Sequence, residues 1–329
     1  MDFSLSEDQL AFLDVAREFA QKQLAPCAAE WDEQKIFPVE TLRAAGALGF
    51  CGMYCPEQLG GTGLSRMDAA LLLEELAQGC TSTAAYISIH NMAAWMVATW
   101  GSADVQAQWL GDLAAGSKFA SYCLTEANAG SDAASIKTSA QRVADHYVIN
   151  GAKAFISGAG DTDVLVVMAR TGDSGPGGIS AFVVPSDTPG VSFGKNETKM
   201  GWNSQATRAI TFEDARIPAV NRLGDEGEGF AIAMRGLEGG RINIAACSLG
   251  AAQATLDMSQ RYLGEREQFD QPLADFQALQ FRLADMATEL VAVVSAVRAV
   301  TASRPCSSRS SGGLKGAAAG AAAGVAAGA

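Results

Sequence analysis

Residues Tyr122-Cys-Leu-Thr-Glu-Ala-Asn-Ala-Gly-Ser-Asp-Ala-Ala-Ser135 carry more information than any other stretch of this chain. Residues 119–124 are typical of a β-strand, and the small residues that follow form a loop containing Thr125 and Ser131. Such a loop presents backbone N–H groups and hydroxyls at close range, because Ala129-Gly130 leave little side chain in the way. The residues alone favour two interpretations equally: an ordinary strand-to-turn connection, or a site for a polar or anionic ligand.

Hydrophobic periodicity divides the chain into three zones and a compositionally distinct tail. Residues 1–117 show helical periodicity, residues 118–224 contain short strand-like runs between turn residues, and residues 225–300 return to long helical patterns. We therefore expect an α+β chain with an N-terminal α-helical domain, a middle antiparallel β-barrel domain and a C-terminal helical bundle. That bundle is expected to be truncated, because two long helices need more partners than remain in the chain.

Local signals place the individual elements. Ser6 and Ser65 are predicted helix N-caps, and Pro38 is expected to open a short helix that ends at Gly46. Further helices are predicted over residues 82–99, 230–262 and 276–300, and strands over residues 147–149, 164–168, 179–184 and 209–212. The first of these helices is apolar around most of its circumference and is therefore expected to be buried.

Composition excludes several classes of function. The net charge of −12 and pI near 4.7 argue against nucleic acid as a partner, since phosphate binding needs a basic surface. The two histidines, His90 and His146, lie far apart in the sequence, so a metal site is not expected. No apolar run approaches the ~20 residues of a membrane span. Seven scattered cysteines and the lack of a leader pattern predict reduced thiols and a cytoplasmic location.

The opening motif resembles the flavin and substrate signature of the acyl-CoA dehydrogenase family. Cys123 to Ser135 matches the pattern small-Leu-Thr-Glu-x-x-small-Gly-Ser-Asp-x-x-Ser throughout. Further family-like motifs occur in family order before and after it, at residues 60–65, 151–157, 201–202, 236–241 and 266–269. The likeness extends from about residue 3 to Arg298 and then stops.

The resemblance implies a function and a set of site residues. It implies FAD-dependent α,β-dehydrogenation of a short branched acyl-CoA such as isobutyryl-CoA, with electrons passed to an electron-transferring flavoprotein, by a homotetramer. The implied FAD contacts within one chain are Tyr122, Cys123, Leu124, Thr125, Ser131, Phe155, Ile156 and Ser157. The implied contacts to the FAD of a neighbouring subunit are Arg266, Gln268, Phe269, Phe276 and Gln277. The implied substrate contacts are Ser131, Glu238, Gly239, Gly240 and Arg241.

The residues alone leave simpler interpretations open at several of these positions. An aromatic residue at Phe155 is favoured as plain barrel core when the resemblance is set aside. The two glycines before Arg241 fall in the middle of a helix, where either a ligand or a second helix must approach the backbone closely. Arg266 lies between two glutamates, a pattern more often found on a solvated surface.

No catalytic base is identified in this chain. In most of the family the base is a glutamate late in the C-terminal bundle, and a minority carry it one residue before the arginine that matches Arg241. Gly240 occupies that second position here. Glu238 lies two residues away and points in another direction on a helix, because successive helical residues are rotated by about 100°.

The Ala/Gly/Ser-rich tail, residues 301–329, is expected to be disordered, because it offers too little apolar surface to offset its ordering entropy. A reading-frame change is one explanation of the tail, and a genuine flexible tail is the other. Three functional hypotheses follow: a dehydrogenase, a catalytically inert remnant that binds flavin or CoA, and an oxidase or monooxygenase on the same scaffold. Loss of the base predicts that the chain as given has little or no activity.

Overall fold

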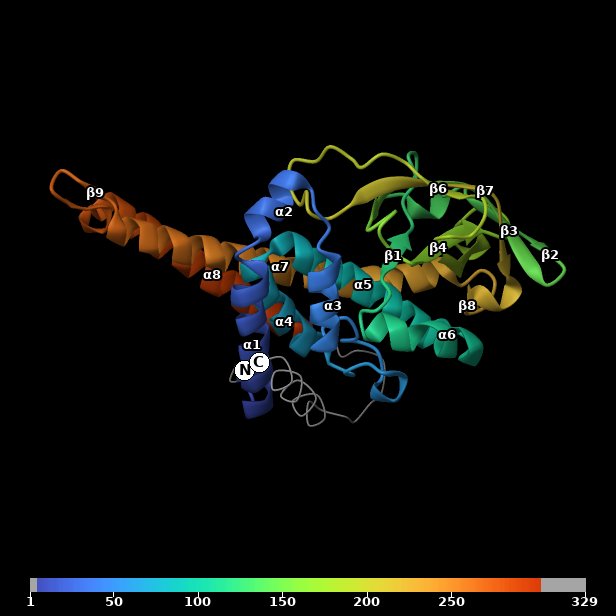
Figure 1. Ribbon diagram of the computed structural model, residues 1–329, viewed down its shortest axis with the longest axis horizontal. Coiled ribbons are helices and arrows are strands. Elements are labelled where there is room, and N and C mark those ends of the chain that lie inside the picture. Colours follow the sequence, from blue (N-terminus) through green and yellow to red (C-terminus); the bar gives the residue numbers. More distant parts are fainter. Residues whose placement is uncertain (1–4, 303–329) are drawn as a thin grey trace.

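The computed structural model describes residues 5–302. Figure 1 shows the strands of the large sheet at one end of the molecule, most of the helices in the middle, and a helical hairpin, with β9 at its tip, extending from the opposite end. The α-helices are α1 Glu7–Phe19, α2 Ala28–Gln34, α3 Val39–Ala47, α4 Arg66–Gly79, α5 Thr81–Trp100, α6 Ala103–Ala114, α7 Gly229–Glu265 and α8 Gln277–Ala302. A π-helical turn, Ala20–Leu24, continues α1.

The helix starts follow from capping residues. The Ser6 hydroxyl accepts a hydrogen bond from the Gln9 backbone N–H, and the Ser6 backbone N–H donates to Gln9 Oε1, which forms a capping box at α1. Ser65 and Asp68 form the same arrangement at α4. Pro38 occupies the N-cap position of α3. The three predicted helix starts are confirmed.

The strands form one eight-stranded sheet and one small hairpin. They are β1 Ala120–Cys123, β2 Ser139–Val143, β3 His146–Ser157, β4 Val164–Arg170, β5 Ile179–Pro185, β6 Val191–Phe193, β7 Thr207–Pro218, β8 Arg222–Leu223, β9 Glu267–Gln268 and β10 Gln271–Pro272. The large sheet has the order β6-β7-β3-β2-β4-β5-β8, with β1 paired to β4.

The middle domain differs in one respect from the expected antiparallel barrel. Most neighbouring strands are antiparallel, but β4 has two parallel neighbours: β1, with Ala120 beside Val164, and β2, with Ser139 beside Arg170. The chain enters the sheet from α6 through β1, so β1 lies at the boundary with the helices rather than in a hairpin. The sheet therefore contains both parallel and antiparallel pairs. Parallel neighbours cannot be joined by a hairpin turn, because their connection must return to the same end of the sheet.

β4 shows how the sheet joins two cores. Val164 and Val166 pack with the helical core, whereas Leu165 and Val167 pack in the second core on the other face of the sheet. A strand buried on both faces needs a continuous apolar run, which is what its sequence contains. The helical domain therefore rests directly on the strands that build the site.

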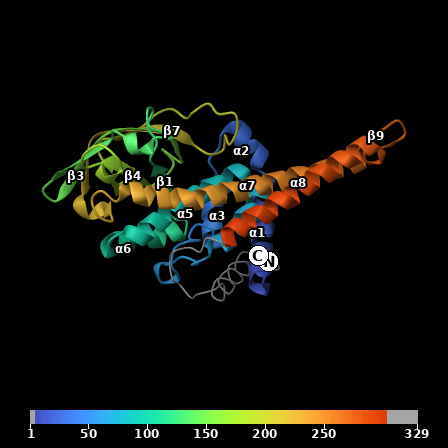
Figure 2. The ribbon, with the colours of Figure 1, turned by 180° about the vertical axis from the view of Figure 1, so that it is seen from behind.

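α7 is the central support of the molecule. It packs against α4, α5 and α8, and α5 is buried on nearly all sides, as predicted. Figure 2 shows α8 returning along α7 from the outer end of the hairpin. α8 extends to Ala302, two residues beyond the predicted limit, and the rest of the predicted tail lies outside the described residues. The predicted domain limits at residues 117, 224 and 300 stay predictions.

Residues 5–302 contain neither a helix suited to cross a membrane nor a cluster of metal-ligating side chains. None of the helices there combines the length and the apolar character of a membrane span. No group of three or more His, Cys, Asp or Glu side chains in that part of the chain is arranged to hold a metal ion.

Candidate functional site

A cavity of about 630 Å³ lies where α5, α7, the start of the signature loop and the end of β3 meet. This volume is within the range of small-molecule sites. Its walls are mainly apolar, with a few hydroxyl groups and one arginine. The lining residues are Ser88, Ile89, Met92, Tyr122, Leu124, Thr125, Gly130, Phe155, Ile156, Ser157, Trp202, Leu237, Gly240, Arg241 and Ile244.

The side chains at the end of β1 and at Leu124, which follows it, alternate between the cavity and the interior of the sheet. Tyr122 and Leu124 face the cavity, and Cys123 packs in the core on the other face, as strand alternation requires. Burial raises the pKa of the Cys123 thiol to about 12, so this cysteine is neutral and unreactive. Any contribution of Cys123 to a ligand must come from its backbone.

The Tyr122 hydroxyl is buried without a hydrogen-bond partner in the described part of the chain. Burial raises the pKa of this phenol, which therefore stays protonated as a donor. A buried hydroxyl without a partner costs about 1–3 kcal/mol. A polar ligand atom in the cavity would remove that cost, so Tyr122 is a candidate ligand contact.

Phe155 is brought into the cavity by an irregularity in β3. Lys153 pairs with Ile210 of β7 and Ile156 pairs with Arg208, so β3 contains one extra residue over this interval. Such a bulge re-aims side chains. Phe155 takes a left-handed backbone conformation, with φ 57°, and is 63% exposed. The core interpretation that the residues alone favoured is therefore wrong.

Trp202 is a second aromatic wall residue on left-handed backbone, with φ 55°. Its loop is attached to α2, because the backbone N–H and the side-chain amide of Asn203 donate to the two Asp32 carboxylate oxygens, at 2.7 and 3.1 Å. Non-glycine residues in this conformation are uncommon and concentrate at functional sites. Phe155 and Trp202 therefore both adopt a backbone conformation that is unfavourable for a residue other than glycine.

α7 contributes one continuous face to the cavity. Leu237, Gly240, Arg241 and Ile244 have the i, i+3, i+4, i+7 spacing of a helix face. A Cβ at Gly240 would meet Met92 Sδ at 3.5 Å, an ordinary contact distance. A Cβ at Gly239 would instead overlap the Arg66 guanidinium. The glycine pair therefore serves both purposes considered from the sequence: Gly239 permits close packing, and Gly240 opens the cavity.

The structure places the other expected site residues elsewhere. Ser131 is exposed and does not line the cavity, although the adjacent Gly130 does. Glu238 is exposed on another face of α7. Arg266, Gln268, Phe269, Phe276 and Gln277 lie at the outer end of the α7–α8 hairpin, near the β9 label in Figure 1. Phe269 is 87% exposed there. These five residues do not line the cavity of their own chain.

Several wall residues were not predicted from the sequence. Ser88, Ile89 and Met92 come from α5, whose apolar character all around gave no sign of which face would meet a ligand. Leu237 and Ile244 could have been found from their helical spacing to Gly240. Trp202 belonged to a quoted motif but was given no role. The buried ion pair between Glu126 and Lys153 was also missed.

The cavity can hold an extended aromatic or acyl group but cannot abstract a proton with the residues described. Its lining contains no Asp or Glu in residues 5–302. Leu124, Thr125, Ser157 and Tyr122 offer polar groups for the edge of a ligand, and Phe155 and Trp202 offer aromatic faces. A planar flavin ring fits this donor set, since the Tyr122 hydroxyl lacks a partner and both aromatic side chains are accessible.

Comparison with protein families gives three consecutive matches. Residues 6–117 match the acyl-CoA dehydrogenase N-terminal domain, residues 121–215 the middle domain, and residues 227–322 the C-terminal domain.

Comparison with curated proteins shows high similarity to two enzymes. The chain is 57% identical to isobutyryl-CoA dehydrogenase, mitochondrial, of Bos taurus over 288 residues, which are 88% of this chain and 69% of that protein. It is 52% identical to the protein of the same name from Dictyostelium discoideum over 287 residues, 87% and 69% of the two chains.

Solved structures show the same architecture. Butyryl-CoA dehydrogenase from Megasphaera elsdenii superposes with a TM-score of 0.87 at 37% identity, covering 93% of this chain and 82% of that one. A chain from a structure described as the electron transferring flavoprotein of Acidaminococcus fermentans superposes with a TM-score of 0.88 at 40% identity, covering 98% and 84%.

Proposed function

The chain belongs to the acyl-CoA dehydrogenase family of FAD-dependent oxidoreductases, and on that premise we propose that its substrate is a short branched acyl-CoA, isobutyryl-CoA above all. The observation that carries the proposal is the single cavity into which Tyr122, Phe155 and Gly240 converge from three separate segments. The names of the two similar enzymes support isobutyryl-CoA, which would place the chain in valine breakdown.

Each wall of the cavity has a defined task in this proposal. Tyr122, Leu124 and Thr125 would contact FAD at one side, and Phe155 to Ser157 at another. Bound FAD would supply the acceptor for the hydride that leaves the β-carbon of the thioester. Met92, Leu237 and Ile244 form the apolar surface that excludes water and limits the length of the acyl group. Arg241 is the cationic group at the cavity for the polar part of the substrate.

A second candidate function is supported by the lack of a carboxylate in the cavity. Dehydrogenation needs a base for the α-proton, and the lining residues in the described part of the chain include none. Loss of a general base costs about 10²–10⁴-fold in rate. We therefore also propose that the described residues alone bind flavin and thioester without turning the substrate over.

An anaerobic titration separates the two candidates. FAD-loaded protein is mixed with isobutyryl-CoA, and the absorbance of oxidised flavin is followed, with butyryl-CoA and a longer straight-chain thioester as comparisons. Loss of absorbance with preference for isobutyryl-CoA supports the dehydrogenase. A shift of the flavin spectrum without loss of absorbance supports the inert binder.

The partners and the location of the protein are part of the proposal. An electron-transferring flavoprotein would take the electrons, and light scattering tests the proposed homotetramer. Five of the six cysteines among residues 5–302 are buried and all six are free thiols, which supports a reducing compartment such as the cytoplasm. Cell fractionation tests that location.

A further inference from the structure

Lys153 is a buried cation beside the cavity wall. Its side chain is 0% exposed, and its Nζ donates to the Leu124 carbonyl at 3.0 Å and to Glu126 Oε1 at 2.9 Å. Leu124 lines the cavity, and Phe155 follows Lys153 by two residues. One ammonium group therefore ties β3 to the start of the signature loop.

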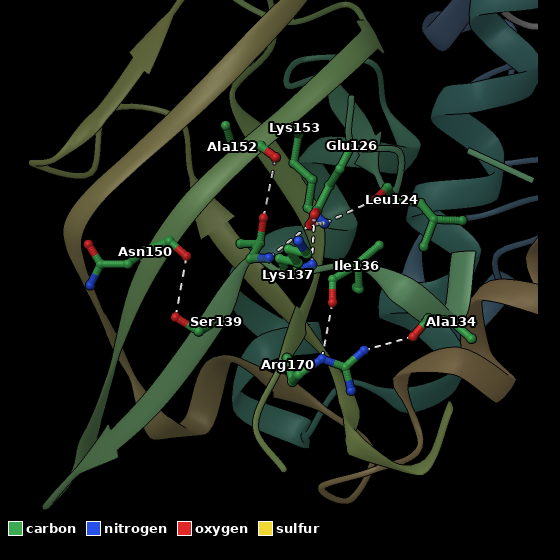
Figure 3. Close-up of polar contacts among 11 residues, drawn as sticks. Leu124, Glu126, Ala134, Ile136, Lys137, Ser139, Asn150, Ala152, Lys153 and Arg170 are labelled. Atoms are coloured by element: carbon green, nitrogen blue, oxygen red, sulfur yellow. Dashed lines mark hydrogen bonds and ion pairs between the residues drawn. The ribbon is translucent and has the colours of Figure 1, made fainter. Parts of the chain in front are cut away.

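Glu126 extends this connection to the far end of the loop. Its two carboxylate oxygens accept hydrogen bonds from the backbone N–H groups of Lys137, at 2.7 Å, and Thr138, at 2.9 Å. The carboxylate thus closes the segment between residues 126 and 138, which contains the cavity residue Gly130. Figure 3 shows Lys153 and Glu126 meeting beside Leu124.

Arg170 of β4 holds the same segment from a second strand. Its Nη2 donates to the Ala134 carbonyl at 2.7 Å and its Nε to the Ile136 carbonyl at 3.0 Å, as drawn in Figure 3. The loop is therefore held by side chains from two strands of the sheet, β3 and β4, which lie on either side of β2. Loops attached in this way keep their ligand-contacting groups in place before the ligand arrives.

The buried charges of Lys153 and Glu126 have a desolvation cost. Burial lowers the pKa of Lys153, and the Glu126 carboxylate opposes that change. Burial acts to raise the pKa of Glu126, but Lys153 and the loop N–H groups together hold it below its usual value. A buried ion pair often stabilises a fold no more than apolar residues of the same size would. The role of the Lys153–Glu126 pair is better explained by the positions in which it holds Leu124 and the loop.

We propose that Lys153, paired with Glu126, is a positioning residue that sets the Leu124–Thr125 wall of the cavity for FAD binding. The Ala154 N–H donates to the Thr125 carbonyl at 2.9 Å, so movement of β3 at Lys153 reaches Thr125 directly. This inference rests on the proposed function, because FAD is the ligand whose contacts the pair would arrange.

The test compares two variants of the full chain with the wild type. The first is the double variant Lys153→Met with Glu126→Gln, which removes both charges and keeps one side-chain oxygen for one of the two loop N–H groups. The second is Arg222→Met, which breaks the Arg222 contacts to Tyr147 and Glu226 in the same sheet, away from the cavity lining. FAD affinity is measured by fluorescence quenching, and amide hydrogen exchange of residues 122–138 is measured without FAD.

The double variant is expected to weaken FAD binding roughly 10-fold or more and to speed exchange in residues 124–138. The Arg222→Met variant is expected to leave both near the wild-type values. Equal loss of FAD affinity in both variants, or unchanged exchange in the loop of the double variant, would overturn the inference. Failure of the wild-type chain to bind FAD would overturn the proposed function, while the exchange measurement would still decide whether Lys153 positions the loop.

Discussion

Gly239 of α7 lies directly against the guanidinium of Arg66, so that a Cβ at Gly239 would overlap that group. The Arg66 guanidinium lies over the rings of Tyr54 and Trp95, and the Cζ atom of Arg66 is 5.6 Å from the centroid of each ring. The next residue, Gly240, faces the cavity with room for a side chain. Two adjacent glycines on one helix therefore meet two different requirements.

The first prediction concerns the stability of these two positions. Gly239→Ala should lower the free energy of unfolding by about 1–3 kcal/mol, because Arg66 must leave its place between the aromatic rings. Gly240→Ala should be neutral or raise it by up to about 1 kcal/mol, because alanine is the better helix former. Urea unfolding followed by circular dichroism measures both. A larger loss at Gly240 than at Gly239 would contradict this assignment of the two glycines.

The second prediction concerns a carboxylate introduced into the cavity, whose lining has none among residues 5–302. Gly240→Glu would place a carboxylate on the cavity face of α7, next to Met92. We expect this variant, loaded with FAD, to lose its oxidised flavin absorbance on mixing with isobutyryl-CoA at least about 10²-fold faster than the starting chain. Gly240→Gln is the control, since it has the same size and cannot take a proton. If the glutamine variant reacted equally fast, proton abstraction at this position would be refuted.

The third prediction concerns Phe155. Because its side chain is largely exposed, Phe155→Ala should change the free energy of unfolding by no more than about 1 kcal/mol. The same truncation at Phe212, which is buried in β7, should cost about 3–5 kcal/mol. FAD binding should show the opposite order, with the larger loss at Phe155. A large loss of stability at Phe155 would restore the core interpretation.

The fourth prediction concerns pH. His90 is buried, with Nε2 2.9 Å from the Leu113 carbonyl and Nδ1 accepting from the Ala120 N–H at 3.1 Å. Burial lowers the pKa of His90 from 6.5 to about 4. Since the folded state binds the proton less well than the unfolded state, the stabilisation is complete above pH 6.5. It declines as the pH falls and is lost near pH 4, by up to about 3 kcal/mol.

Unfolding in urea at several pH values between 4 and 7 tests this dependence. His90→Gln should remove the part of the slope that His90 causes. Identical slopes in the wild type and the His90 variant would show that other groups govern the acid sensitivity.

Much of the fold could be predicted from local pattern. Short stretches of sequence are enough to predict the N-caps at Ser6 and Ser65, the helical periodicity of α1 and the apolar run of β4. Capping and periodicity depend only on residues one or two turns away. The parallel pairing of β1 with β4 was not predicted, because strand neighbours are chosen by contacts between distant segments.

The candidate site shows the same division. Tyr122, Leu124, Thr125 and the segment from Phe155 to Ser157 could be named from motifs alone, and they do line one cavity. Ser88, Met92 and Trp202 gain their place only from packing that joins α5 and the loop at Trp202 to the sheet and α7. No short motif records which side of an apolar helix will face a ligand.

The family of the chain, its helical and strand zones, and the Tyr122–Thr125 and Phe155–Ser157 walls of the cavity could be inferred from the residues alone. Three features depend on tertiary packing: the bulge that turns Phe155 into the cavity, the separate roles of Gly239 and Gly240, and the burial of Lys153 beside Leu124. The physical reason is that periodicity and capping depend on neighbours along the chain. A cavity, a bulge and a buried ion pair depend on which distant surfaces meet, and their free energies arise only when those surfaces have packed.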